Sequence, residues 1–207
     1  ERLSLDETTL AQVLKLAGYA TGLVGKWHLG SLDPRYHPNA RGFDEFAGFR
    51  GGWSDYWKYR LELNDSVQPS NGQYITDVFT DHAVQFIERR RSEPFFLHVA
   101  YNAPHFPIQA PDDHADLFRE TGLFSEGVSR IYGMNHCIDV GVGRILETLR
   151  RHGLDDNTMI LFTSDNGPTD WPKKYLTGPP AGFTGPYRGR KWSLFEGGIR
   201  MPFIARW

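Results

Sequence analysis

In the stretch Tyr19-Ala-Thr-Gly-Leu-Val-Gly-Lys-Trp-His-Leu-Gly30, a short apolar run leads directly into a lysine and a histidine. The apolar run predicts a buried strand that ends at Gly25. Lys26 carries a positive charge and His28 can carry a proton. Because side chains i and i+2 of an extended segment lie on the same face, we expect both residues to line an anion-binding site.

Two further apolar runs end in the same way. Phe95-Phe-Leu-His-Val-Ala-Tyr101 leads into Ala103-Pro-His105, and Met159-Ile-Leu-Phe-Thr-Ser164 leads into Asp165-Asn-Gly167. Ligands of open α/β sheets bind at the carboxyl ends of the strands. We therefore expect these three strand ends to form the floor of one catalytic site.

Helical patterns alternate with the apolar runs. Apolar residues recur at helical spacing from residue 10 to 17, from 75 to 86 and from 128 to 149. Ser4-Leu-Asp-Glu7 resembles a capping box for the first helix, and a last strand is expected near 201–207. Residues 31–72 lack a clear period, which predicts a long surface excursion. The pattern indicates the α/β class, with a mostly parallel central sheet sandwiched by helices.

Composition excludes several classes of protein. The 207 residues suffice for one domain, and a net charge of −2 argues against a general nucleic-acid binder. No apolar run approaches the length of a membrane span. Cys137 is the single cysteine, so an internal disulfide and a thiolate zinc site are excluded, and we expect it to be a small buried apolar residue.

Each polar residue at the strand ends also has a structural interpretation. Asp165 and Asn166 offer adjacent hard oxygen ligands for Ca²⁺ or Mg²⁺, but Asp-Asn-Gly is also a common turn. Lys26 and His28 are a surface lysine and a structural histidine on that view, and His105 merely fills a proline-rich loop. Their joint placement at strand ends favours the functional interpretation.

With these motifs the chain resembles the type I, formylglycine-dependent sulfatases, which are arylsulfatase-like members of the alkaline phosphatase superfamily. The resemblance rests on four blocks in family order: Gly18–Gly30, Ala103–Pro107, Thr163–Gly167 and Lys191–Arg200. It implies an alkaline phosphatase-like fold, the sulfatase N-terminal domain. Residues 1–207 would be the central part of a single sulfatase catalytic domain, an internal fragment incomplete at both ends.

The resemblance also implies a role for each site residue. Asp165 and Asn166 would be metal ligands for Ca²⁺, with Mg²⁺ as second choice. Lys26 and Lys191 would clamp the sulfate oxygens, and His28 would handle the proton of the hydrated aldehyde nucleophile. His105 would face the leaving oxygen, with Lys191 beside it. The family activity is that of a sulfuric ester hydrolase, which cleaves sulfate monoesters.

The chain departs from the family pattern in two respects. It has no Cys/Ser-x-Pro/Ala-x-Arg motif, from which the formylglycine is made, and it lacks the family's acidic pair near the amino end. Both are expected upstream of Glu1, so the fragment alone is expected to be inactive. The resemblance further implies a formylglycine-generating or sulfatase-maturing enzyme as partner, and a periplasmic, secreted or lysosomal protein.

The resemblance implies that the substrate is a small-molecule or glycan sulfate ester. Trp53 and Trp57 lie in an aromatic segment of the long loop after the first catalytic strand. They either pack this loop onto the sheet or form a substrate-binding wall that stacks on a sugar or aryl group.

Two alternative functions remain open at this level. A related phosphodiesterase or phosphatase with two zinc ions would place a histidine after the strand-end aspartate, where this chain has Asn166. A sulfated-ligand binding protein would keep the pocket and lack the nucleophile.

Overall fold

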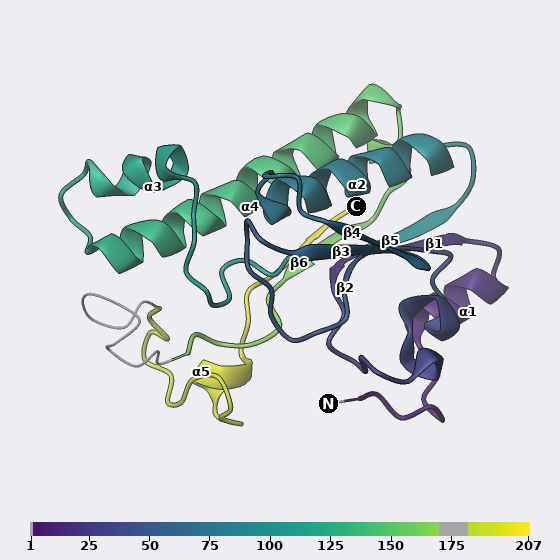
Figure 1. Cartoon of the computed structure of the whole chain (residues 1–207), viewed down its shortest axis with the longest axis horizontal. Coiled ribbons are helices and arrows are strands. Elements are labelled where there is room, and N and C mark those ends of the chain that lie inside the picture. The colour runs from purple at the N-terminus through teal and green to yellow at the C-terminus, as the bar shows by residue number, and fades with distance from the viewer. Residues whose placement is uncertain (1, 170–181) are drawn as a thin grey trace. The chain divides into compact units, whose positions relative to one another are not determined.

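The computed structural model describes residues 2–169 and 182–207 (Figure 1). Its elements, in chain order, are α1 (Leu10–Leu16), β1 (Ala20–Lys26), η1 (Pro34–Tyr36), η2 (Pro38–Arg41), β2 (Glu45–Phe49), β3 (Arg60–Leu63), β4 (Ser66–Pro69), α2 (Ile75–Arg90), β5 (Phe95–Ala100), α3 (Asp112–Arg119), α4 (Glu126–Arg151), η3 (Asp155–Asn157), β6 (Ile160–Thr163), α5 (Glu196–Ile199) and β7 (Phe203–Arg206). The chain forms two compact units, Glu1–Pro107 with Cys137–His152, and Ile108–His136 with Gly153–Trp207.

The first unit contains a five-stranded sheet in the order β4-β3-β2-β1-β5. β1 pairs in parallel with both β2 and β5, whereas β2–β3 and β3–β4 are antiparallel. The predicted α/β class is confirmed, but the predicted parallel arrangement holds only around β1. The physical reason is the two-residue connection Asn64-Asp65 between β3 and β4, because a hairpin turn joins only antiparallel strands.

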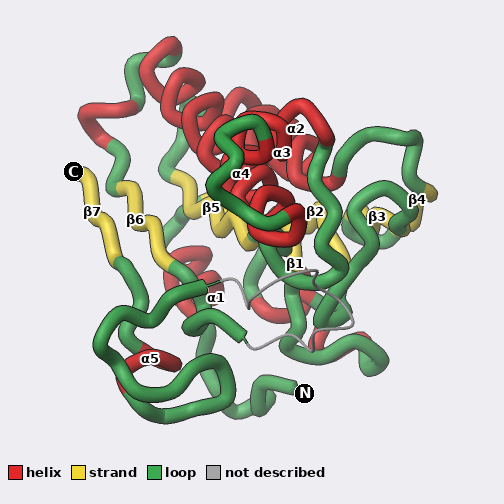
Figure 2. The backbone as a smooth tube through the Cα atoms, turned by 90° about the vertical axis from the view of Figure 1, so that its left-hand side faces the viewer, coloured by secondary structure: helices red, strands yellow, loops and turns green. Residues whose placement is uncertain are grey.

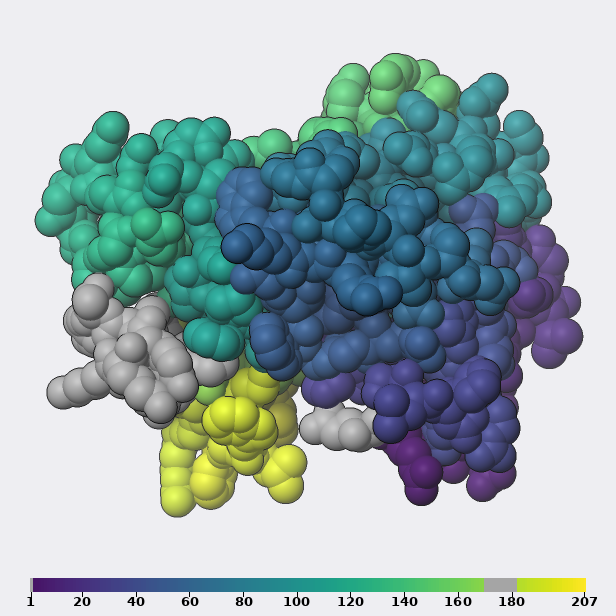
Figure 3. Space-filling view, viewed as in Figure 1, coloured from purple at the N-terminus to yellow at the C-terminus, as the bar shows by residue number. Residues whose placement is uncertain are grey.

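The predicted surface excursion at 31–72 is wrong. This stretch contains β2, β3 and β4, and it buries several large aromatic side chains: Tyr36, Phe43, Phe46, Phe49, Tyr56 and Tyr59. In Figure 3 the blue part of the chain forms a closely packed layer rather than a projecting loop. The strands are only four or five residues long, too short for a period to show among glycines and prolines.

Helices cover both faces of this sheet, as predicted. On one face, Leu23 of β1 forms a buried cluster with Ala11 of α1 and with Phe43 and Phe46. On the other face, α2 lies over β1 so closely that a Cβ on Gly22 would overlap the ring of Phe86. Figure 1 shows α1 and α2 on opposite sides of the strands.

The helix predicted around 128–149 is confirmed as α4, and its second half packs on α2. Gly141 lies against the hydroxyls of Thr80 and Tyr101, which are 2.7 Å apart. Arg144 pairs with Asp81 at 2.6 Å at the surface of the same contact. A helix glycine therefore permits the close approach of α4 to α2.

The helix cap predicted at Ser4 lies instead at Thr9. The Thr9 hydroxyl accepts a hydrogen bond from the Gln12 amide at 3.1 Å, and the Gln12 side chain accepts one from the Thr9 amide at 2.9 Å. Both stretches have the spacing of a capping box. Thr9 is the one that immediately precedes the apolar residues of α1.

The second unit contains a two-stranded antiparallel sheet of β6 and β7, seen side by side in Figure 2. Both strands were predicted, but the expected parallel pairing of β6 is not found in the described part of the chain. α3 packs on the first half of α4, where Gly133 lies against Ala115. In residues 2–169 and 182–207, no helix is both long and apolar enough to cross a membrane.

Candidate active site

Lys26 is the last residue of β1, and the strand ends around it are held unusually close together. Gly25 has φ +113°, and a Cβ there would overlap the carbonyl oxygen of Ala100 at the end of β5. A Cβ on Gly48 of β2 would likewise overlap the carbonyl oxygen of Gly25. Glycine is therefore required at both positions, and the three strand ends meet directly beside Lys26.

His28 is held by the end of the neighbouring strand β2. The Trp27 amide donates to the carbonyl of Phe49 at 3.0 Å, and the His28 amide donates to that of Arg50 at 3.2 Å. His28 has φ +56°, a left-handed conformation that is uncommon outside glycine. The expected i, i+2 alternation of Lys26 and His28 therefore does not apply, because His28 is no longer in extended backbone. Such outliers cluster at functional sites.

His105 lies in the turn that follows β5. Its amide donates to the carbonyl of Asn102 at 2.8 Å, and its ring Nδ1 lies 2.8 Å from the carbonyl oxygen of Phe106. Because a carbonyl oxygen only accepts, Nδ1 is assigned the proton.

Tyr56 is a residue of this site that the sequence did not single out. Its hydroxyl oxygen lies 2.9 Å from the carbonyl oxygens of both Asn102 and His105, so the β2–β3 loop is tied to the His105 turn. The only signal in the sequence was its place in the aromatic segment 53–59, which does not distinguish one ring from another.

The two tryptophans predicted to bind substrate, Trp53 and Trp57, have different environments in the structure. Trp57 packs its ring on Tyr74, with ring centroids 5.1 Å apart, and its amide donates to the Asp55 carboxylate at 2.8 Å. Trp53 is 62% exposed, against 37% for Trp57. Trp57 thus has a clear structural contact, whereas Trp53 presents most of its surface to solvent.

The second unit contains Asp165, Asn166 and Lys191. In this unit, backbone hydrogen bonds join the loop after β6 to the segment that contains Lys191 and Gly198. The Gly167 amide donates to the carbonyl of Gly198, and the Lys191 amide donates to that of Pro168, both at 2.9 Å. A Cβ on Gly167 would overlap the carbonyl oxygen of Gly197. The loop after β6 and the Lys191 segment therefore lie in backbone contact.

The residues after β6 offer side-chain oxygen atoms, which is the kind of ligand that a hard cation prefers. The Asn166 side-chain nitrogen donates to the carbonyl of Gly167 at 2.9 Å, so a ligand atom from this side chain would be Oδ1; the side chain of Asp165, the preceding residue, is exposed. Ca²⁺ takes about six to eight oxygen ligands. Within the described residues no group of three or more His, Cys, Asp or Glu side chains is placed to hold a metal. The two oxygens thus fit as part of a ligand set.

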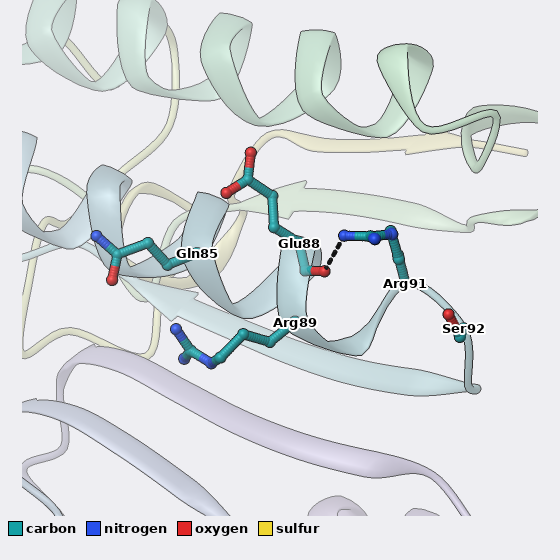
Figure 4. A pocket seen from close by; sticks show the side chains of 5 residues that line it. All are labelled: Gln85, Glu88, Arg89, Arg91 and Ser92. Carbon is teal, nitrogen blue, oxygen red and sulfur yellow. Dashed lines mark hydrogen bonds between the residues drawn. The ribbon is translucent and has the colours of Figure 1, made fainter.

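A hollow of about 440 Å³ lies at the carboxyl end of α2 in the first unit (Figure 4). It is lined by Gln85, Glu88, Arg89, Arg91 and Ser92. The strand β5 begins there, so the hollow lies at the edge of the sheet opposite to Lys26. Cys137 is 1% exposed, so its predicted burial is confirmed.

Comparison with known proteins gives a consistent result. The family model described as Sulfatase matches residues 1–207. An uncharacterized sulfatase of Escherichia coli (strain K12) is 34% identical over 99% of this chain and 40% of its own length. Arylsulfatase J of Mus musculus is 36% identical over 96% of this chain and 34% of its own length.

A similar solved structure is that of Ps i-CgsB in complex with k-i-k-neocarrahexaose. It is 34% identical, with a TM-score of 0.88, and the match covers 100% of this chain and 49% of that chain. The chain thus spans less than half the length of each of these three proteins.

Proposed function

Because the chain belongs to the sulfatase family, we propose that it is the central part of a catalytic domain that hydrolyses sulfate monoesters. The observation that carries this proposal is the placement of Lys26 and the His105 turn. Lys26 is the last residue of β1 and the His105 turn follows β5, and these two strands are paired in parallel up to Gly25 and Ala100. A lysine and a histidine thereby lie at the same edge of the sheet.

The substrate sets the first requirement. A sulfate monoester is an anion that resists nucleophilic attack, so a site has to supply positive charge before the S–O bond breaks. We propose that Lys26 and Lys191 bind the sulfate oxygens. Cations held in place before the reaction stabilise the transition state more than flexible ones, because no reorganisation is needed.

We propose that His105 and His28 carry out the proton transfers. In this proposal His105 donates to the leaving oxygen through Nε2, the ring atom opposite the one assigned to the Phe106 carbonyl. His28 handles the proton of the nucleophile.

We propose that Asp165 and Asn166 supply two of the ligands of Ca²⁺, with Mg²⁺ second. When bound, the cation supplies Lewis-acid polarisation of a sulfate oxygen, and the family's formylglycine supplies the nucleophile. The residues of this chain bind the sulfate, orient it and move protons.

The proposed substrate class is a sulfated glycan. Ps i-CgsB, at 34% identity, is known in complex with a neocarrahexaose. In this chain the exposed Trp53 lies in the loop after β2, and the Arg50 carbonyl of the same loop accepts a hydrogen bond from the His28 amide. An indole in such a place stacks on the apolar face of a sugar. Trp57 contributes to the same wall from its packed position.

Three further predictions from the resemblance stay predictions. They are the single catalytic domain, the maturing enzyme as partner, and the periplasmic, secreted or lysosomal compartment.

The test uses the complete protein with its matured nucleophile. Lys26→Ala is expected to lower kcat/KM for a sulfate ester by at least about 100-fold, since a charge acting on the transition state is lost. The matched control is Lys58→Ala, an exposed lysine of the β2–β3 loop. Sulfate release is followed by ion chromatography. A faster turnover of the corresponding phosphate ester, or unchanged activity in Lys26→Ala, would overturn the proposal.

A further inference from the structure

Tyr56 is fully buried although it lies in a loop. Its exposed fraction is 0%, and its ring stacks on that of Tyr74 with centroids 5.3 Å apart and planes inclined by 19°. Its own carbonyl accepts the amide of Ile75, the first residue of α2, at 3.0 Å. Tyr56 is therefore anchored to the start of α2 by both its ring and its backbone.

The hydroxyl of Tyr56 points from this anchor to the base of the His105 turn. Its oxygen lies 2.9 Å from the carbonyl oxygens of both Asn102 and His105, and the His105 amide closes the turn onto Asn102 at 2.8 Å. A phenol has one proton, so the two carbonyls share it in a three-centre bond or take it in turn. Burial, followed by the neighbouring Tyr74, raises the pKa of Tyr56, so this donor stays protonated.

Removal of the hydroxyl would leave both carbonyls without this donor. Losing a donor to a buried acceptor costs free energy, although the Asn102 carbonyl would keep the His105 amide. The turn relieves that cost by moving its carbonyls toward water, and the His105 ring moves with them. The ring position is thus coupled to the Tyr56 hydroxyl although the two side chains belong to different loops.

We propose that Tyr56 is a positioning residue that holds the His105 imidazole in the orientation needed for proton donation to the leaving oxygen. This inference rests on the role of His105 in the proposed function. Tyr56 acts through the backbone of the Asn102–His105 turn and does not itself touch substrate.

The experiment compares Tyr56→Phe with Tyr59→Phe in the complete protein. Tyr59 is a matched control, because it is also buried and its hydroxyl also donates to a loop carbonyl, that of Gln73 at 3.1 Å. Tyr56→Phe is expected to lower kcat at least about tenfold for a sulfated sugar, with little change in KM. The loss should be much smaller for para-nitrophenyl sulfate, whose leaving group hardly needs a proton. Tyr59→Phe is expected to affect the two substrates equally and slightly.

A second measurement does not depend on activity. Hydrogen exchange followed by mass spectrometry should show the His105 amide protected in the wild-type protein, faster in Tyr56→Phe and unchanged in Tyr59→Phe. If the His105 amide of the wild-type protein exchanges as fast as an amide in an open loop, the inference is overturned. This outcome can be read even where Tyr56→Phe does not fold. Equal losses on both substrates, or unchanged exchange in a folded Tyr56→Phe, also overturn it. A wild-type protein without sulfatase activity would instead refute the proposed function and leave the exchange result standing.

Discussion

Gly52 faces the imidazole of His28 so closely that a Cβ at position 52 would lie 2.6 Å from Nε2. The β2–β3 loop therefore packs directly on one of the proposed catalytic rings. The loop contacts His28 in two ways, because the His28 amide also donates a hydrogen bond to the Arg50 carbonyl at 3.2 Å.

Gly52→Ala is expected to displace the His28 ring and lower kcat/KM for a sulfate ester by about 10-fold or more, because a misplaced proton carrier is ineffective. Gly51→Ala is the control, since its added Cβ would meet only the Trp53 carbonyl at 3.8 Å. Steady-state kinetics on both variants of the complete protein decide the matter. Equal activity in the two variants would contradict the expected contact.

Asp165→Ala is expected to abolish metal uptake and activity together, because a carboxylate is the main charged ligand from this loop. Metal content is measured by mass spectrometry after exchange into metal-free buffer. Asp156→Ala, an exposed aspartate just before β6, serves as control. Stoichiometric zinc with little calcium in the wild-type protein would refute the calcium assignment.

Trp53→Ala is expected to weaken turnover of a sulfated oligosaccharide by about 10-fold, the loss of roughly 1.4 kcal/mol of stacking, while sparing a small sulfate ester. Trp57→Ala is expected to affect stability as well, because its ring packs on Tyr74. Kinetics with the two substrates and a thermal melt separate these effects. Equal losses of turnover on both substrates would show that Trp53 has a structural role and does not bind the sugar.

Two glycines of α4 should respond oppositely to alanine. Gly141→Ala is expected to destabilise the fold by about 1–3 kcal/mol, because the new Cβ would lie 2.5 Å from the Thr80 hydroxyl. Gly143→Ala meets nothing within 4 Å and should stabilise the helix by about 0.5–1 kcal/mol. Urea unfolding of both variants measures the difference. A destabilised Gly143→Ala would show that α4 packs differently.

Stability should fall with acidification partly through His82 of α2. Burial, assisted by Arg89 and opposed by Asp81, lowers the pKa of His82 below its ordinary value. The folded state therefore favours the neutral ring. Its stabilisation is complete above about pH 6.5, the value for the unfolded chain, and is lost as the pH falls from there toward the lower folded-state pKa.

His82→Gln should reduce this loss. The free energy of unfolding is compared at about pH 7.5 and about pH 5.5 in the wild type and in the variant. An equal drop in both proteins would show that His82 does not contribute.

The sequence by itself determined the long helices, the strands β1, β5, β6 and β7, and the candidate residues at the strand ends. These features are local, because apolar periodicity over many residues and the motif at Gly18–Gly30 can be recognised without knowledge of any contact. The sequence also correctly placed Cys137 in the interior.

Only the tertiary structure decided the roles of individual residues in the β2–β3 loop. The burial of Tyr56 and the packing of Trp57 depend on partners at distant positions, namely Asn102, His105 and Tyr74, whereas Trp53 stays exposed. Side chains of the same chemical type in one short segment carry no local signal that separates them. The pairing of β3 and β4 was missed for a similar reason, because short strands are stabilised by their neighbours rather than by their own sequence.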